Sequence, residues 1–322
     1  MKCNWLCVFS LVFFVVCENV YGERPMMWID ACAGEPVEQA AMVADLGTAR
    51  VLYLGERHTL ARHHAAQAAI IAKLADGDAS LVVAMEPLES ARQTEIDRFN
   101  RGELDFDGLA KAISWADQWS NYQQYRPVLE AARKAKAPVI GLGPKAEAIR
   151  AVVRSGGVAK LDKKARKQLP EMMELNDPAY EKLLSAQLKV HKAATPERLR
   201  PMIDAQIARD EAMSAALADY LTSTAGRGRK AVVICGSGHV AYGLGTPKRV
   251  RRRLGDDSDR IVILAECGEL RLSVEEQAAS QPVEITHEEL RAIGRPVGDY
   301  IGVAPPEEKE GRRGNAGRKE GK

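Results

Sequence analysis

The sequence predicts an α/β fold, with a mostly parallel central sheet flanked by helices and with helical insertions that form a smaller cap domain. Short apolar runs followed closely by Gly or Glu are typical of buried parallel strands. Helical patterns separate the first four of these runs, as in βαβ units. Two helix-rich intervals are too long for simple crossovers, so we expect them to pack beside the sheet as the cap.

The composition is that of a soluble globular protein. Hydrophobic residues make up 46% of the 322 residues and charged residues 28%, which is enough apolar material for a sizeable core. Lys and Arg number 46 against 44 Asp and Glu, which leaves a net charge of +2. Because this balance does not attract the phosphates of a nucleic acid, we expect no nucleic-acid partner. The sequence has no repeat period of the kind that fibrous and solenoid proteins show, so we exclude both classes.

The first 22 residues predict a signal peptide. Their apolar run, residues 5–16, is shorter than the ~20 residues that a membrane-spanning helix needs. Cleavage before Glu23 is one processing route. Lipidation of Cys17 is the other, although Val16 departs from the small residue that normally precedes a lipidated cysteine, and an uncleaved membrane anchor is a third interpretation. We therefore expect an exported protein that is periplasmic or anchored to a membrane by a lipidated N-terminus.

Three cysteines remain after the signal region, namely Cys32, Cys235 and Cys267. Their odd number and wide separation fit neither a zinc site nor a disulfide framework. Cys235 and Cys267 fall in strand-like runs, so we expect them to be small buried hydrophobic side chains.

Five apolar runs are the predicted strands of the sheet. In chain order they are residues 51–54, 81–85, 138–140, 231–234 and 261–264. The predicted cap insertions cover about 90–136 and 146–227, and the second contains a long amphipathic stretch over 197–221.

These elements divide the chain into three parts. Residues 1–22 are the predicted signal peptide, residues 23–304 the α/β domain with its cap insertions, and residues 305–322 a tail. The tail has mixed charge, several glycines and no large apolar residue, which predicts disorder.

Polar side chains follow three of the predicted strands, at the carboxyl end of each. Glu56 and His58 follow the first strand, Glu86 the second and His239 the fourth. Ligand sites of open parallel sheets gather at this edge, so we expect the four side chains to converge on one rim. Pro87 is expected to end the second strand, and the glycines before His239 allow a tight turn.

Two histidines and two carboxylates fit two kinds of chemistry. They are a ligand set for a divalent metal, and they fit acid–base catalysis without a metal equally well. Neither the HExxH motif of zinc proteases nor the GxSxG motif of serine hydrolases is present. In a purely structural interpretation, Glu56 caps the next helix and His58 lies on the surface. His63 and His64 of that helix are expected to be a solvated pair, with at most one facing the site.

The most aromatic segment after the signal region holds Trp115, Trp119, Tyr122 and Tyr125. The first three are spaced four and three apart, so we expect them to share one helix face. Pro127 disfavours helix at the residue before it, which predicts that Tyr125 lies near a helix end and points outward. The stripe either packs under the cap or stacks on a flat apolar ligand that a phenol holds.

Gln206, Arg209, Asp210 and Met213 follow the spacing of one helix face. If that face turns toward the sheet, it buries polar side chains, which is unusual unless they are paired or line a pocket. The alternative is that Arg209 and Asp210 are surface charges.

Taken in order, these motifs resemble the ChaN-like haem-binding lipoproteins of bacteria, a family related in fold to the Tiki, TraB and erythromycin-esterase proteins. The resemblance covers about residues 45–265, and the ordered set is more specific than any member of it. It rests on Gly55-Glu56-Arg57-His58, Met85-Glu86-Pro87, Trp119, Tyr125, Pro127, Gln206, Arg209-Asp210, Met213, Gly236-Ser237-Gly238-His239 and Tyr242-Gly243.

The resemblance implies a protein that binds haem near the cell surface and serves haem or iron acquisition. It also implies a tyrosine as iron ligand and haem shared across a homodimer, with an outer-membrane haem receptor as a further partner. Tyr125 is then the first choice of ligand and Tyr242 the reserve. A free phenol has a pKa near 10, so Fe(III) and a cation such as Arg126 or a rim histidine must stabilise the phenolate.

The expected cofactor-binding residues are therefore Tyr125, Trp119, Arg126, His58, Gln206, Arg209, His239 and Tyr242. We expect a haem-binding protein rather than an enzyme. The rival hypothesis is a hydrolase of the Tiki or erythromycin-esterase kind, in which Glu56, His58, Glu86 and His239 hold a metal or move protons. A pure interaction protein with a vestigial site is the third hypothesis.

Overall fold

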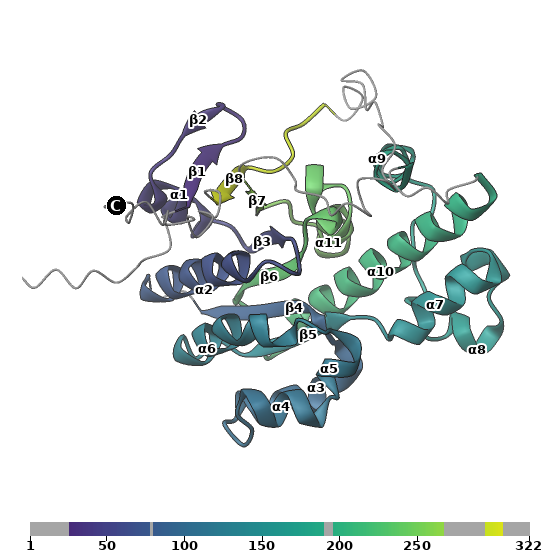
Figure 1. Cartoon of the computed structure of the whole chain (residues 1–322), viewed down its shortest axis with the longest axis horizontal. Coiled ribbons are helices and arrows are strands. Elements are labelled where there is room, and N and C mark those ends of the chain that lie inside the picture. The colour runs from purple at the N-terminus through teal and green to yellow at the C-terminus, as the bar shows by residue number, and fades with distance from the viewer. Residues whose placement is uncertain (1–25, 78–79, 190–195, 267–293, 305–322) are drawn as a thin grey trace, which may run out of the picture.

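The structure is a computed structural model that describes residues 26–77, 80–189, 196–266 and 294–304. Its centre is an eight-stranded sheet with helices on both faces (Figure 1). The fold is therefore α/β with a mostly parallel sheet, as predicted. The predicted signal peptide with Cys17, the predicted tail and Cys267 lie outside the described residues. In the part of the chain that the structure describes, no helix has the length and apolar character to cross a membrane.

The strand order across the sheet is β2-β1-β8-β7-β3-β6-β4-β5. The pairs among β3 to β8 are parallel, and β1 runs antiparallel to β2 and β8. The strands are β1 Met27–Asp30, β2 Glu35–Pro36, β3 Val51–Glu56, β4 Leu81–Glu89, β5 Val139–Gly143, β6 Lys230–Gly236, β7 Asp259–Glu266 and β8 Tyr300–Ala304.

All five strands predicted from apolar runs are present, as β3 to β7. β1, β2 and β8, which have four, two and five residues, were not predicted. β1 and β2 are short and combine apolar with charged residues, so they give no periodic signal of their own, whereas β8 is an apolar run that was overlooked. They extend the sheet beyond β7 and lie away from the carboxyl ends of β3, β6 and β4.

The α-helices lie between the strands in the chain. They are α1 Gln39–Leu46, α2 Ala61–Asp76, α3 Gln93–Asn100, α4 Phe106–Ala112, α5 Trp115–Gln118, α6 Arg126–Lys134, α7 Ala146–Ser155, α8 Lys163–Arg166, α9 Pro178–Lys189, α10 Pro196–Thr222 and α11 Thr246–Leu254. The long amphipathic stretch expected over 197–221 is α10.

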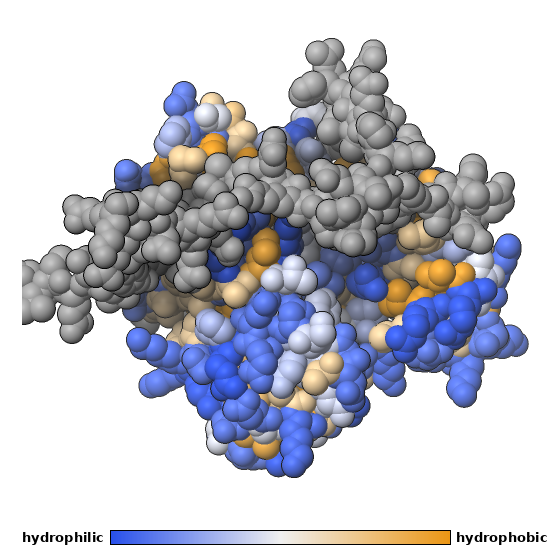
Figure 2. Space-filling model, in the orientation of Figure 1, coloured by the Kyte–Doolittle hydropathy of each residue, from blue (hydrophilic) through white to orange (hydrophobic). Residues whose placement is uncertain are grey.

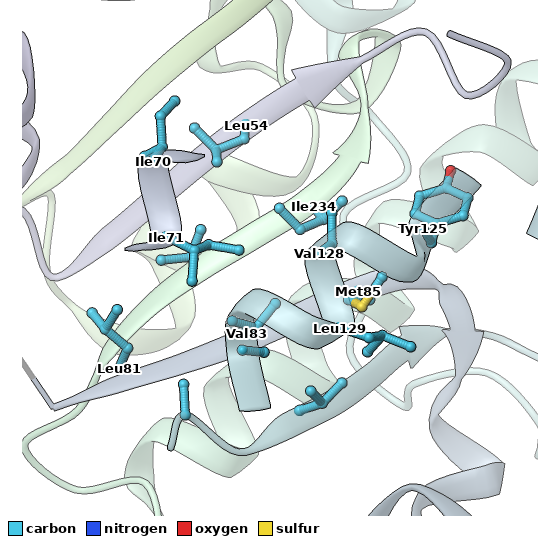
Figure 3. Packing of buried hydrophobic residues seen from close by; sticks show 14 of the residues in the cluster. Leu54, Ile70, Ile71, Leu81, Val83, Met85, Tyr125, Val128, Leu129 and Ile234 are labelled. Carbon is cyan, nitrogen blue, oxygen red and sulfur yellow. The ribbon is translucent and has the colours of Figure 1, made fainter. Parts of the chain in front are cut away.

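Alternate residues of the central strands face opposite helix layers. Leu52 and Leu54 of β3 belong to a core shared with α2 and α6, whereas Val51 and Tyr53 belong to a core shared with α10. Figure 3 shows part of the first core, with side chains from β3, β4, α2 and α6 gathered between the sheet and the helices. This alternation is what strands buried on both faces require, and it explains their continuous apolar sequences.

The two helical insertions pack differently. Residues of the first insertion, among them Phe106, Trp115 and Leu129, share the core of α2 and the sheet. The second insertion builds two further clusters, one around Val152 and Ala205 and the other around Tyr180 and Ile207. On the face in Figure 2, hydrophilic side chains dominate the end that carries α4, and an apolar area lies at the α7–α8 end.

Two local expectations were wrong. β4 does not end at Pro87 but continues to Glu89, because an irregularity in its pairing with β5 between Met85 and Glu89 accommodates the missing N–H. The aromatic segment is not one helix. α5 ends at Gln118, Trp119 has extended backbone angles, and a 3₁₀ turn over Tyr122–Tyr125 follows.

Side chains of α3 close the outer edge of β5. The Asn100 amide accepts from the Val139 N–H at 2.8 Å and donates to the Val139 carbonyl at 2.9 Å. The Gln93 amide accepts from the Gly141 N–H at 3.0 Å. These amides satisfy backbone groups that a neighbouring strand would otherwise bind.

Candidate ligand-binding site

The carboxyl ends of β3, β6 and β4 bring the four rim side chains together. The strands are neighbours in the order β3-β6-β4, so Glu56 and His58, His239, and Glu86 come from three adjacent strand ends. The expected convergence is confirmed, because His58 lies 3.0 Å from Glu56 and 4.0 Å from Glu86, which is itself 3.2 Å from His239. Gly236 is required here, since a Cβ on it would lie 2.8 Å from Nε2 of His58.

Glu56 is a buried carboxylate with two donors at each oxygen. Oε1 accepts from the Tyr125 hydroxyl at 2.5 Å and from Nδ1 of His58 at 3.0 Å. Oε2 accepts from Gln67 at 2.6 Å and lies 3.0 Å from Nδ1 of His64. Burial opposes the charge, but the bonds from His58 and His64 lower the pKa of Glu56 to about 2. The carboxylate therefore stays ionised and fixes the ring of His58.

His58 is the rim residue best placed to meet a ligand. Its side chain is 33% exposed and lines the pocket, whereas Glu56 beneath it is fully enclosed. With Nδ1 bonded to Glu56, the neutral tautomer that carries its proton on Nδ1 leaves Nε2 as a free base or metal ligand. The edge of Trp119 packs against the ring, with centroids 4.8 Å apart, and Asn121 donates to the His58 carbonyl.

A second charged chain runs from Glu86 through His239 to Asp210. Nε2 of His239 lies 3.2 Å from Glu86, and Nδ1 lies 2.8 Å from Asp210. Asp210 also accepts from the hydroxyls of Tyr180 at 2.7 Å and Thr246 at 2.8 Å. Burial opposes protonation of His239, but the two carboxylates raise its pKa to about 10. The same pairing lowers the pKa of Glu86 against its own burial, so His239 is an imidazolium held between two carboxylates.

A pocket of about 890 Å³ opens beside this rim. The size lies within the range of small-molecule and cofactor sites. Its walls come from β4, the segment after α5, β5 and the start of α7, with Arg209 of α10 opposite. The lining residues are His58, Glu86, Pro87, Glu89, Ala91, Arg92, Asp117, Gln118, Trp119, Gly143, Pro144, Lys145, Ala146, Glu147, Ile149, Arg150, Arg209 and His239.

Two cations of the pocket wall have no carboxylate partner among the described residues, namely Lys145 and Arg209. The other basic wall residues do have partners, since Arg92 pairs with Glu95 and Arg150 with Glu147. Lys145 and Arg209 are therefore the groups that an anionic part of a ligand would meet.

The structure contradicts the expectation that Tyr125 points outward. Tyr125 does lie at the start of α6, but its side chain is fully buried and its hydroxyl donates to Glu56. Burial, and then the negative charge of Glu56, raise the pKa of this phenol well above its ordinary value. Packing explains why Tyr125 points inward, because its ring fills the space between Trp115 and His64. In this conformation both burial and the neighbouring carboxylate oppose the phenolate form that iron ligation requires.

Two other residues expected at the cofactor lie elsewhere. Arg126 stacks over Phe106 and bonds to Asp107 at 2.6 Å, so it faces away from the pocket. Tyr242 is partly buried against the cluster around Tyr180 and is not a pocket residue. Trp119, in contrast, does line the pocket.

The helix face over 206–213 turns inward, as one of the two interpretations had it. The Gln206 amide lies 3.0 Å from Nδ1 of His239, Asp210 is fully buried, and Met213 belongs to the core under the sheet. The surface-charge alternative is wrong for Asp210, and Arg209 lines the pocket.

The expected solvated pair His63 and His64 is also wrong, since both side chains are fully buried. His63 lies 3.0 Å from Glu266, and burial lowers its pKa to about 4. His64 supports Glu56 directly, and although burial opposes it, its bonds to Glu56 raise its pKa. Gln67 was missed as well, although its three-residue spacing from His64 on α2 put both on one face.

The divalent-metal hypothesis finds no support in this geometry. Throughout the described part of the chain, no group of three or more His, Cys, Asp or Glu side chains is arranged to hold a metal ion. The rim carboxylates are occupied by hydrogen-bond donors instead. Cys235, expected to be a small buried hydrophobic residue, is one.

Comparison with known proteins places the fold. The chain is similar to the ChaN protein of Campylobacter jejuni, solved with cofacial haem, at 18% identity, with 86% of this chain and 96% of that one covered and a TM-score of 0.63. It is less similar to the erythromycin esterase EreC, a histidine-to-asparagine mutant in its open conformation, at 10% identity over 71% and 73% of the two chains with a TM-score of 0.44. No curated protein matches significantly.

The family model described as haem-binding uptake, Tiki superfamily, ChaN matches residues 42–250, which is more than half of the chain and includes every rim residue. The chain belongs to this ChaN family of the Tiki superfamily.

Proposed function

We propose that this protein binds haem in the pocket beside the rim. The observation that carries the proposal is the combination of groups in one cavity: an accessible imidazole from His58, the ring of Trp119, and the two cations Lys145 and Arg209. A flat apolar macrocycle with two carboxylates matches such a set, and the family to which the chain belongs is a haem-binding one.

The residues present fit the chemistry of the group. Trp119 with Pro87, Pro144 and Ile149 would contact the apolar faces of the macrocycle. Lys145 and Arg209 would bind the propionates, because each lacks a carboxylate among the described residues. Bound haem supplies an iron centre whose ligation can be read from its visible spectrum.

For the iron ligand, the observed conformation favours His58 over Tyr125. His58 lines the pocket, and its bond to Glu56 orients its ring there. Tyr125 would first have to leave Glu56 and the packing around it. Tyrosine ligation, inferred from the family resemblance, is therefore kept as the second choice.

The cellular role that we propose is haem or iron acquisition by an exported protein, with haem shared across a homodimer and received from an outer-membrane receptor. The resemblance to the ChaN-like lipoproteins and the apolar N-terminal run support this role. Analytical ultracentrifugation of the haem-free and haem-loaded protein at several concentrations tests the homodimer, since dimer formation should depend on haem.

Titration of purified protein with haemin, followed by visible spectroscopy, tests haem binding. The wild type should give a saturable shift of the Soret band. His58→Ala should weaken binding by about tenfold or more and change the ligation signature. Tyr122→Phe is the control, because among the described residues that hydroxyl bonds only to the exposed Gln123. A wild-type titration that gives only free haemin would refute the function. An unchanged spectrum in His58→Ala would refute the ligand alone.

A second candidate function is acid–base hydrolysis, favoured by the Glu56–His58 pair beside the imidazolium of His239. Nε2 of His58 would take a proton from water while the water oxygen attacks an ester carbon. The ester C–O bond would break, and the departing oxygen would take from Nε2 of His58 the proton that came from the water. The positive charge of His239 would stabilise the negative charge that develops.

Ester hydrolysis measured with and without a chelator tests this second function. His58→Ala and His239→Ala should each lower turnover by about a hundredfold. The turnover of the double variant should be no lower than that of the less active single variant, as for residues that act as a unit. Additive losses would show two unrelated sites. Absence of any turnover over background would remove the candidate.

A further inference from the structure

The segment that follows α7 carries a dense positive charge. Residues 158–170 contain four lysines and one arginine against a single acidic residue, Asp162. Lys163, Lys164 and Lys167 are all exposed, and no described residue forms an ion pair with any of them. Asp162 is used as the cap of α8, where it accepts from the Ala165 N–H at 2.7 Å. We refer to residues 153–172 as the basic lobe.

Exposed apolar side chains occur in the same lobe. Three large hydrophobic side chains are exposed among the described residues, and two of them are Val153 and Met172, at 44% and 72% exposure. Figure 2 shows an apolar area at the α7–α8 end, next to strongly hydrophilic side chains. Isolated exposed apolar residues are common. Here, however, two of the three exposed large hydrophobic side chains lie on one short lobe, beside a run of lysines.

The lobe is a fixed element rather than a loose loop. Arg166 does not add to the exposed charge, because its guanidinium donates to the carbonyls of Leu169, Pro170 and Glu171 at 3.3, 2.8 and 2.7 Å. These bonds fold the chain after α8 back against the helix. Arg253 also donates to the Met172 carbonyl at 2.9 Å, so the backbone that carries Met172 is fixed as well.

We propose that the basic lobe docks on the surface of a membrane that contains anionic phospholipid. The three lysines would bind lipid phosphates, and Val153 and Met172 would enter the boundary between headgroups and acyl chains. The composition favours a lipid surface over a protein partner, since residues 146–177 contain no Phe, Trp or Tyr to serve as an interface anchor. Lysine also suits a diffuse anionic surface, whereas planar recognition of single carboxylates favours arginine.

Docking would fix the orientation of the pocket. α7 has pocket-lining residues in its first turns, and its last residues, from Val153 to Ser155, belong to the basic lobe. Arg150 lines the pocket and lies three residues before Val153, which is about 5 Å along α7, so docking would bring one wall of the pocket close to the lipid surface. This proposal is independent of which ligand the pocket binds.

Sedimentation of the full-length chain with vesicles tests the proposal. Binding should rise when phosphatidylglycerol is added to phosphatidylcholine vesicles and should fall with salt. The variant K163E/K164E/K167E should lose at least about a hundredfold in affinity, since each lysine near an anionic surface contributes roughly fivefold. Met172→Ser should weaken binding without changing its salt dependence.

The matched control is K73E/K111E/K134E, which changes the net charge equally at exposed lysines of α2, α4 and α6. It should bind vesicles like the wild type. Both variants share the same N-terminus, so any insertion of the N-terminus into the vesicle contributes equally to the binding of both. Equal losses in the two triple variants would overturn the proposal in favour of a net-charge effect. Binding that does not depend on phosphatidylglycerol would overturn it too, and retained capture of an acidic protein would then point to a protein partner.

Discussion

At the scale of single residues, the centre of the site is a carboxylate rather than a histidine. Glu56 accepts from Tyr125, His58, Gln67 and His64, and each bond orients a side chain that the site uses. A buried charge with four donors is stable where an unpaired one would not be. The orientation of the His58 ring, and so the position of its Nε2 atom, therefore depends on Glu56.

The Tyr125 hydroxyl provides a test of that arrangement. Tyr125→Phe keeps the ring packed against Trp115 but removes one donor from a buried carboxylate, so we expect a loss of about 1–3 kcal/mol in the free energy of unfolding. Urea denaturation measures it, with Tyr122→Phe as the control that should leave stability unchanged. The haem spectrum should be retained in both variants. Its loss in Tyr125→Phe alone would show that the tyrosine is the iron ligand.

The lowered pKa of Glu56 and the raised pKa of His239 predict opposite effects of pH on stability. The pKa of Glu56 falls from 4.5 to about 2, so its contribution is full above pH 4.5 and is lost as the pH falls toward 2. The pKa of His239 rises from 6.5 to about 10, so its contribution is full below pH 6.5 and is lost as the pH rises toward 10.

Denaturation midpoints across this pH range check both signs. Glu56→Gln should flatten the acid limb, and His239→Asn should flatten the alkaline limb, because each removes the titrating group. An alkaline limb that is the same in His239→Asn would show that His239 is not an imidazolium in the folded protein.

At the scale of elements, strands were predictable where they are buried on both faces. The apolar runs of β3 to β7 follow directly from this burial, and the rim followed from the rule that their carboxyl ends share an edge. β1 has only four residues of mixed polarity and is stabilised by pairing with β8, so it leaves no pattern, whereas β8 is an apolar run that was overlooked.

The site was less predictable than the sheet, because its missing members act through tertiary contacts. His64 and Gln67 look like an ordinary helix face until β3 brings Glu56 against them. Tyr125 was placed correctly along the chain but not in depth, since spacing gives the helix end and says nothing of which cavity the ring fills.

The edge of β5 predicts an effect of Asn100. Asn100→Ala removes the acceptor of the Val139 N–H, while the Val139 carbonyl keeps the Gln93 amide at 3.2 Å, so we expect a loss of about 1–3 kcal/mol in the free energy of unfolding. Arg101→Ala is the neighbouring control, because that side chain only pairs with Glu103 on the surface. Equal unfolding curves for the wild type and Asn100→Ala would show that water replaces the amide at no cost.

At the scale of the whole molecule, the apolar N-terminal run makes a prediction about processing. The apolar run over 5–16 predicts that the mature chain begins at Glu23 or at a lipidated Cys17. Mass spectrometry of protein purified from its own cells distinguishes the two, since lipidation adds the mass of the acyl groups. An intact Met1 on the soluble protein would contradict export.

The amides of α3 also limit how copies of this chain can assemble. A second molecule cannot continue the sheet past β5 by adding a strand, because Asn100 and Gln93 already hold the hydrogen-bonding positions of Val139 and Gly141. A homodimer on this side of the molecule must therefore join through helix or loop surfaces. Such an interface leaves the backbone of each sheet untouched and lets two pockets approach each other as preformed units.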